Sequence, residues 1–216
     1  GQPLLVALRR HRIFSVQHNT LHIGVFDGDS WHNNEILDVV AAAVHSNTER
    51  MAVCFNNGTI SLWQTNVPSR LILEFQVPVM PAGLLNTVQF SPHGSVIAVH
   101  SEPFNLDADR VIHFYDTESG VLVRQLNLYR DGIHSFSFSP DNLHFAAITD
   151  THVYLWNLIT GRQVVSMMHS PIYTRGLVAF SPCGRILATA MGNAGVLLWK
   201  IRMQQDCDDD AVRISF

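Results

Sequence analysis

Lysine is almost absent from this chain of 216 residues, because Lys200 is the one lysine beside thirteen arginines. The acidic residues outnumber the basic ones only slightly, and the formal net charge is −4. A charge this small creates no overall field that would draw the protein to nucleic acid or to an anionic membrane. Attraction by the whole surface is therefore excluded as the basis of its function.

Cysteine is also scarce, and Cys54, Cys183 and Cys207 form no CxxC pair. An odd number of unpaired cysteines excludes a disulfide framework and favours a reducing compartment. Cys54 lies in an apolar run, where a small buried side chain is the simpler interpretation. We expect an intracellular protein of the cytoplasm or the nucleus.

Long apolar runs and helical periodicity are both missing. The longest apolar run, residues 39–44, is far too short to cross a bilayer, and no signal-peptide pattern opens the chain. No stretch of eleven residues has apolar spacing near 3.6, so helices are not expected. Because the chain opens with Gly1 and not with methionine, we expect its numbering to start inside a longer protein or after a tag.

Motifs for catalysis and metal binding are absent too. The sequence has no GxSxG, no HExxH and no glycine-rich phosphate loop, and its twelve histidines have no ligand spacing. The acidic stretches at Asp107 to Asp109 and 206–210 have no apolar neighbours to raise a carboxyl pKa, so we interpret them as solvated loops. We therefore expect that the protein is not an enzyme and that it has no catalytic residue, no metal and no cofactor.

What the sequence does contain is a tripeptide, Phe-Ser-Pro, at positions 90–92, 138–140 and 180–182. A polar turn follows each copy, then an apolar run, and then a segment that ends in Tyr115, Trp156 or Trp199. The last two copies are 42 residues apart. A period of about 40–45 residues with this pattern is typical of a propeller blade of four strands.

The same pattern continues toward the N-terminus, with closing aromatics at Phe26 and Trp63. It predicts an all-β domain over 1–216 with about five four-stranded antiparallel blades. Their approximate ranges are 3–36, 37–78, 84–128, 132–168 and 174–216. The spacing also predicts a stunted fourth strand after Phe26 and a widened loop at 102–110.

These residues resemble the WD-repeat family of β-propellers over nearly the whole chain. The likeness rests on the Phe-Ser-Pro turns, the small apolar second strands such as 146–150, and the Leu-Trp endings. The Trp-Asp pair and the Gly-His pair of the family are never intact here. Asp150 matches the aspartate of the family's turn, and without the histidine we expect it to be partly solvated or bonded to backbone amides.

Family propellers usually have seven blades, which leaves the blade count open. The chain could be a fragment of a larger propeller, a long insertion could have been removed from it, or a partner chain could supply the missing blades. A self-closed ring of five blades is the alternative, since propellers of four to eight blades exist.

The resemblance implies a non-enzymatic scaffold for protein–protein interaction, with partners bound by the loops of one propeller face. Those loops join second to third strands and fourth to first strands. The expected partner-binding residues are Asn57, Phe104, Asp107, Asp109, Tyr129, Arg130, Tyr173 and Arg175.

A sharper hypothesis is the substrate receptor of a cullin-type ubiquitin ligase. Such receptors resemble this family and often carry Trp-Asp-x-Arg, of which Trp199 and Arg202 remain here. Arg202 is then the candidate adaptor contact. A scarcity of lysine suits a protein that works beside a ubiquitin-transfer enzyme, because lysine is the acceptor.

The competing hypothesis is a phosphoinositide- or nucleic-acid-binding propeller that uses the basic cluster Arg9 to Arg12. Four residues are few for such a surface, and a solvated hairpin turn is the simpler interpretation of the cluster. Binding that falls steeply with salt would distinguish the two.

Overall fold

The structure is a computed structural model, and it describes most of the chain. The described residues are 4–9, 12–26, 31–65, 70–77, 84–102, 109–128, 131–169, 176–191, 195–203 and 212–215. All regular elements among them are β-strands, which form five four-stranded antiparallel sheets. In these residues no helix is long and apolar enough to cross a membrane.

Each sheet is made of four strands that are consecutive in the chain. The first contains β1 (Leu4–Arg9), β2 (Arg12–Gln17), β3 (Thr20–Phe26) and β4 (Trp31–Leu37). The second contains β5 (Val39–His45), β6 (Arg50–Phe55), β7 (Thr59–Gln64) and β8 (Arg70–Gln76). The third contains β9 (Leu84–Phe90), β10 (Val96–Glu102), β11 (Val111–Asp116) and β12 (Leu122–Asn127).

The fourth sheet contains β13 (Ile133–Phe138), β14 (His144–Thr149), β15 (His152–Asn157) and β16 (Gln163–Met168). The fifth contains β17 (Gly176–Phe180), β18 (Ile186–Met191), β19 (Val196–Met203) and β20 (Val212–Ser215). The chain divides into two compact units, Gly1–Tyr129 with the first three sheets and Arg130–Phe216 with the last two.

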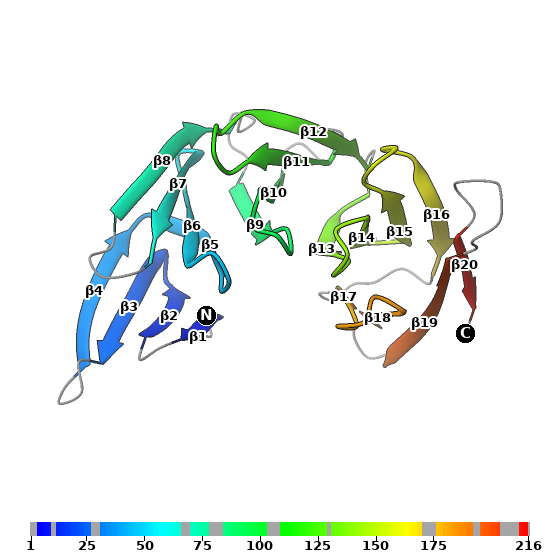
Figure 1. Cartoon of the computed structure of the whole chain (residues 1–216), viewed down its shortest axis with the longest axis horizontal. Helices are drawn as coiled ribbons and strands as arrows, with labels where there is room; N and C mark the ends of the chain where they lie inside the picture. Colours follow the sequence, from blue (N-terminus) through cyan, green and yellow to red (C-terminus); the bar gives the residue numbers. More distant parts are fainter. Residues whose placement is uncertain are drawn as a thin grey trace. The chain divides into compact units, whose positions relative to one another are not determined.

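In the first unit, the first strands of the sheets, β1, β5 and β9, lie side by side (Figure 1). Apolar side chains fill the space between successive sheets. Phe14 and Leu21 of the first sheet pack against Met51 and Val53 of the second. The opposite side of the second sheet, with Ala52, Cys54, Ile60 and Leu62, packs against Phe90, Ile97 and Tyr115 of the third.

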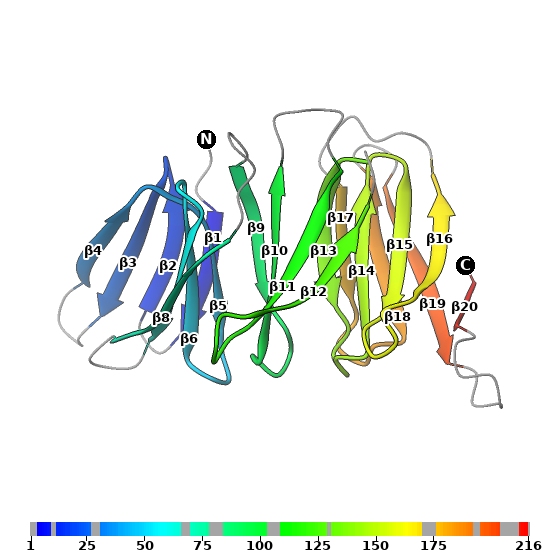
Figure 2. The same ribbon diagram turned by 90° about the horizontal axis from the view of Figure 1, so that it is seen from above.

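The second unit repeats this arrangement, with β13 beside β17 (Figure 2). Its core combines two sets of side chains, Ala146, Ile148, Val153 and Leu155 from the fourth sheet and Val178, Leu187, Trp199 and Ile201 from the fifth. The indole Nε1 of Trp199 donates to the Thr189 hydroxyl at 2.8 Å. Burial of the apolar face of each sheet against the next is therefore the main stabilising interaction within each unit.

The Phe-Ser-Pro tripeptide is explained by the turn between the first and second strands. In all three copies the serine Oγ accepts a hydrogen bond from the backbone five residues later, as from Val96 to Ser91 at 3.1 Å. The serine carbonyl accepts a second bond from the residue three positions on, which has positive φ in each case: Gly94, Asn142 and Gly184. Glycine and asparagine tolerate this left-handed conformation best.

The predicted stunted fourth strand after Phe26 is wrong. β4 is a full strand that pairs with β3 along its whole length, from Trp31 opposite Phe26 to Leu37 opposite Thr20. The spacing between the closing aromatics Phe26 and Trp63 is short because a single residue, Asp38, joins β4 to β5. Asp38 has a φ of 61°. The prediction for Cys54 is confirmed, since it is fully buried, and this burial raises the pKa of its thiol to about 12.

Candidate functional site

Every sheet has two ends with different connections. At the loop end the second strand joins the third and the fourth strand leads to the next sheet. At the turn end the first strand joins the second and the third joins the fourth. Along the chain, the partner-binding residues predicted from the sequence fall between a second and a third strand or between a fourth strand and the next first strand.

Two of these predicted residues can be placed. Asn57 lies in the β6–β7 turn, exposed, with its Oδ1 accepting a hydrogen bond from the Thr59 backbone at 2.9 Å. Asp109 is exposed and lies shortly before β11. Outside the described residues are Phe104, Asp107, Tyr129, Arg130, Tyr173 and Arg175.

The two basic candidates are placed only by their backbone. Arg202 lies in β19 opposite Arg213 of β20. Arg9 ends β1 and pairs with Arg12, the first residue of β2. The side chains of these arginines, and the residues 10–11 between the strands, are outside the described part of the chain. Their proposed contacts remain predictions.

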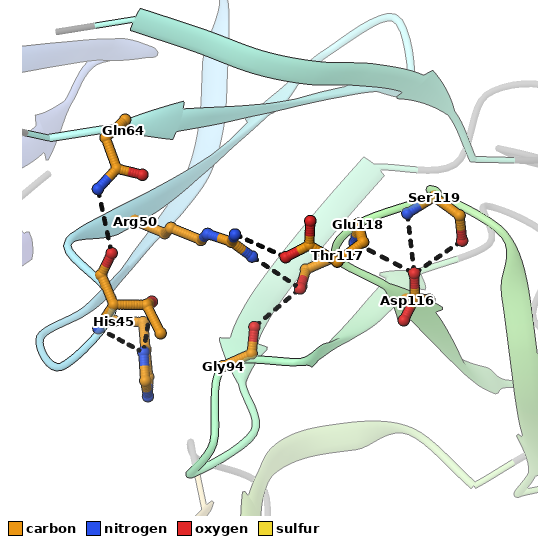
Figure 3. Close-up of polar contacts among 9 residues, drawn as sticks. His45, Arg50, Gln64, Gly94, Asp116, Thr117, Glu118 and Ser119 are labelled. Atoms are coloured by element: carbon orange, nitrogen blue, oxygen red, sulfur yellow. Dashed lines mark hydrogen bonds and ion pairs between the residues drawn. The ribbon is translucent and has the colours of Figure 1, made fainter.

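A polar network connects the turn ends of the second and third sheets (Figure 3). Arg50, at the start of β6, forms an ion pair with Glu118 through Nη2 at 2.6 Å. Its Nη1 donates to the Thr117 hydroxyl at 3.3 Å, and that hydroxyl donates to the Gly94 carbonyl at 2.8 Å. Thr117 is fully buried, so the arginine reaches into the packed junction between the sheets.

The imidazole of His45 forms the second half of this junction. Its Nδ1 lies 2.7 Å from the Thr48 hydroxyl, and its Nε2 lies 3.0 Å from the Pro92 carbonyl of the third sheet. A Cβ on Gly94 would lie only 2.7 Å from this ring, so glycine is required for space as well as for its φ of 71°. The turn end of the first unit is therefore held in one arrangement by side chains that fit closely.

The next turn of the third sheet is closed by Asp116. Its Oδ1 accepts hydrogen bonds from the backbone and hydroxyl of Ser119 and from the Glu118 backbone. The bonds from Ser119 lower the pKa of the Asp116 carboxyl, because they favour its charged form. Asn157 closes the corresponding turn of the fourth sheet through bonds from the backbones of Ile159 and Thr160. Asp116 and Asn157 both follow the closing aromatic of their sheet, at the position of the aspartate in the family's Trp-Asp pair, and each accepts backbone hydrogen bonds within its turn.

A second polar network lies at the loop end of the fourth sheet, in the second unit. The Asp131 Oδ2 accepts hydrogen bonds from the hydroxyls of Thr149 and Thr151, and it lies 3.4 Å from His152 Nδ1. Thr149 also accepts a bond from the His152 backbone at 3.0 Å. The carboxylate of Asp131 is mostly buried and is satisfied by these neighbours, as a buried carboxylate must be.

Asp150 belongs to the same loop end and confirms the expectation for it. Its Oδ2 accepts a hydrogen bond from the Gly132 backbone at 3.0 Å, and its side chain is 49% exposed. The Oδ1 lies 3.0 Å from His134 Nε2, at ion-pair distance. A histidine thus does reach this aspartate, but from β13 and not from the family's Gly-His position.

Both networks are made of polar groups that interact with one another within the fold. Carboxylates, hydroxyls and imidazoles are bonded to one another, and within the described residues no group of histidine, cysteine and carboxylate side chains could hold a metal ion. Sequence reasoning missed Arg50, Thr117 and Asp131, since the partners of Arg50 lie 67 and 68 residues away and those of Asp131 lie 18 and 20 residues away. For the loop end of the fourth sheet, the one usable signal in the sequence was the position of Asp150, which matches the aspartate of the family's turn.

Comparison with known proteins gives consistent results. The family model for the WD domain, G-beta repeat, matches residues 120–157. Subunit 5 of the transcription initiation factor TFIID from Caenorhabditis elegans is 24% identical over 146 residues, which is 66% of this chain and 21% of that protein. The target of rapamycin complex subunit wat1 from Schizosaccharomyces pombe is 29% identical over 119 residues, 54% of this chain and 36% of wat1.

Among solved structures, Hsv2 from Kluyveromyces lactis superposes with a TM-score of 0.76 at 18% identity. The superposition covers 99% of this chain and 72% of that one. This likeness concerns the fold. The chain spans only about a fifth to a third of the length of the two curated relatives.

Proposed function

We propose that this chain, which resembles the WD-repeat β-propellers in one repeat of its sequence and in its fold, is a non-enzymatic scaffold that binds other proteins within a multi-subunit complex. The relatives named above are themselves described as subunits of complexes. The observation that carries the proposal is a closely packed scaffold with exposed polar groups in its loops. Side-chain networks join the turn ends of the second and third sheets, and Asn57 and Asp109 are exposed at loop ends of the first unit.

Such a surface suits protein recognition. Loops on a rigid scaffold can vary in sequence without loss of the fold, and they commonly carry the binding residues. In the second unit, Asp150 is half exposed on a loop end whose geometry is set by Gly132 and His134. We include in the proposed partner surface the loop-end residues predicted from the sequence: Asn57, Phe104, Asp107, Asp109, Tyr129, Arg130, Tyr173 and Arg175.

Quantitative affinity purification of the tagged full-length protein tests this proposal. Asn57→Arg places a bulky charge at a loop end, and Asn47→Arg places the same charge at the turn end of the same sheet, where Asn47 is also exposed. We expect Asn57→Arg to reduce recovery of the associated subunits and Asn47→Arg to leave it unchanged. Equal recovery with both variants would contradict a loop-end binding surface.

A finer proposal is that the complex is a cullin-type ubiquitin ligase with this chain as substrate receptor. Its support is the spacing of Trp199 and Arg202 and the scarcity of lysine. We expect Arg202→Ala to abolish co-purification of the ligase adaptor, with Arg213→Ala on the neighbouring strand as the control. If the adaptor is not recovered with the unmodified protein, this finer proposal is dropped and the scaffold proposal stands.

The proposed location is the cytoplasm or the nucleus. Within the described residues Cys54 and Cys183 are both free thiols, as expected in a reducing compartment. Fluorescence microscopy of the tagged protein checks this directly.

A further inference from the structure

Two aspartates fasten two segments of the chain together at the loop end of the fourth sheet. Asp131 and Gly132 precede β13, and Asp150 lies in the turn between β14 and β15. The Asp150 backbone donates to the Gly132 carbonyl at 3.0 Å, and the Gly132 backbone donates in return to Asp150 Oδ2 at 3.0 Å. A Cβ on Gly132 would lie only 2.5 Å from that oxygen, so the segments approach as closely as glycine permits. Together with the hydroxyl bonds from Thr149 and Thr151 to Asp131, we call these contacts the clasp.

One aspartate of the clasp, Asp131, faces His152 of β15. His152 Nδ1 lies 3.4 Å from Asp131 Oδ2 and 2.7 Å from the Thr151 hydroxyl oxygen. Because a carboxylate only accepts, the Thr151 hydroxyl gives its hydrogen to Asp131 and can only accept one from His152. Nδ1 of His152 therefore carries a hydrogen in the neutral ring, and a further proton would go to Nε2. That proton would make the ring a cation beside the carboxylate.

The other aspartate, Asp150, faces His134 of β13. His134 Nε2 lies 3.0 Å from Asp150 Oδ1, yet this nitrogen is buried and forms no hydrogen bond with the described residues. A hydrogen bond needs alignment, whereas the attraction between opposite charges depends mainly on distance. The geometry is therefore better suited to an imidazolium beside a carboxylate than to a neutral ring.

Few other charges act on these two pairs. Among the described residues at this end, the one further titratable side chain is His169, which follows β16. The described residues at the same end of β17, β18 and β19 have no charged side chain. Arg130 and Arg175 lie outside the described residues, and an arginine stays charged at neutral and mildly acidic pH, so neither adds to a change with pH. Protonation of the two paired rings would thus cancel the charge of both carboxylates.

We infer that this loop end is a pH-sensitive device, in which protonation of His134 and His152 tightens the clasp and loss of these protons loosens it. Histidine side chains ordinarily titrate at about pH 6.5 and aspartates at about pH 4, so the change falls between about pH 7.5 and 5.5. In the protonated state each aspartate is held by a charged ring as well as by neutral donors, and such charge-assisted bonds are stronger.

The clasp is placed where it can act on partner binding. Tyr129 and Arg130, which belong to the proposed partner surface, directly precede Asp131 in the sequence. Regulation of partner binding by the clasp rests on the proposed scaffold function, and the pH dependence of the clasp does not.

The expected sign separates the clasp from the rest of the second unit. His144 is buried at the turn end of the same sheet, and burial lowers its pKa below the usual 6.5. Through His144, acidification lowers the stability of the unit as a whole, because the unfolded chain binds the proton more readily. A tighter clasp at lower pH therefore cannot result from a general gain in stability.

Amide hydrogen exchange of the full chain, followed by NMR, tests the inference. Protection factors remove the intrinsic pH dependence of exchange. The amides of Gly132 and Asp150 report on the clasp, and the amide of Asn142, which donates to the Ser139 carbonyl at 2.9 Å, reports on the turn end. From pH 7.5 to 5.5 we expect protection at the clasp to rise at least about threefold, because a partly exposed ion pair contributes up to a factor of about five. Asn142 should gain no protection.

Variants show whether the two histidines are responsible. His134→Gln with His152→Gln keeps polar side chains but removes both titrating rings, so the rise should disappear. His93→Gln, at an exposed turn of the first unit, is the matched control and should retain it. Should the double variant not fold, His134→Gln alone decides, because it should reduce the rise.

Clasp protection that stays constant or falls from pH 7.5 to 5.5 in the unmodified chain overturns the inference. A rise that persists undiminished in the histidine variants does the same. Since no partner is present in this experiment, its outcome is independent of the purification test of the scaffold proposal.

Discussion

Leu155 and Leu198 occupy the same place in two successive sheets, yet their environments differ almost completely. Each precedes the closing tryptophan of its sheet and lies opposite an alanine. Leu155 is 1% exposed in the core of the second unit, and Leu198 is 59% exposed. Replacing each by alanine removes the same atoms, so the difference in stability measures the difference in packing.

The expected magnitudes follow from burial. Leu155→Ala removes a fully packed side chain between two sheets and leaves a cavity, which costs about 2–5 kcal/mol of unfolding free energy in protein cores. Leu198→Ala removes groups that are mostly in water already, and full burial of a leucine side chain is worth only about 1.5–3 kcal/mol. We therefore expect Leu198→Ala to cost less than about 1 kcal/mol.

Urea unfolding followed by tryptophan fluorescence measures this difference, because Trp156 and Trp199 both report on the second unit. At an unchanged slope, Leu155→Ala should lower the midpoint by about 1–2 M urea, and Leu198→Ala should change it little. Equal losses for the two variants would refute the reasoning, since they would mean that Leu198 is as well packed as Leu155 in the isolated chain. A Trp31→Phe, Trp63→Phe background removes the signal of the first unit.

Three further predictions concern the first unit. Arg50→Met should lower the unfolding free energy by less than about 1 kcal/mol, because its carboxylate partner is exposed, and the loss should shrink at high salt in denaturant titrations. Gly94→Ala should lower the melting temperature more than Gly184→Ala does. At both positions alanine at positive φ costs about 1–2 kcal/mol of strain, but only at Gly94 would the new Cβ also collide with the hydrogen-bonded ring of His45. Burial, with a smaller contribution from a second histidine, lowers the pKa of His113 below its usual 6.5. The contribution of this histidine to stability is therefore present above pH 6.5 and is lost as the pH falls toward the lowered pKa. In unfolding titrations from pH 8 to 5, the unfolding free energy should fall less for His113→Gln than for the unmodified protein.

The fold was largely predictable because the repeat is a local pattern. Phe-Ser-Pro fixes a turn through a serine hydroxyl and a residue of positive φ, all within six residues. The alternation of apolar and polar residues, together with the residues that favour turns, then predicts the strands between these turns. The error at β4 came from the same source, because spacing alone cannot distinguish a short strand from a one-residue link such as Asp38.

The networks were not predictable, because their partners are distant in sequence. Arg50 and Thr117 are 67 residues apart and meet only when the turns of two sheets are brought together. Asp150 shows the intermediate case. Its turn position was readable from the repeat, while the histidine beside it, His134, comes from a different element than the family pattern indicates.

By itself the sequence determined the architecture: all-β, four strands to a blade, about five blades of the WD-repeat type, and none of the spacings that catalysis or metal binding would require. Those properties depend on short-range turn chemistry and on the period of the apolar residues. Only the tertiary structure decided which of the apolar side chains on these strands are buried against a neighbouring sheet. Leu155 and Leu198 have the same sequence context, but they differ in burial. Among the described residues a neighbouring sheet covers Leu155 and none covers Leu198. The sequence cannot show this, because burial depends on two surfaces and not on one chain segment.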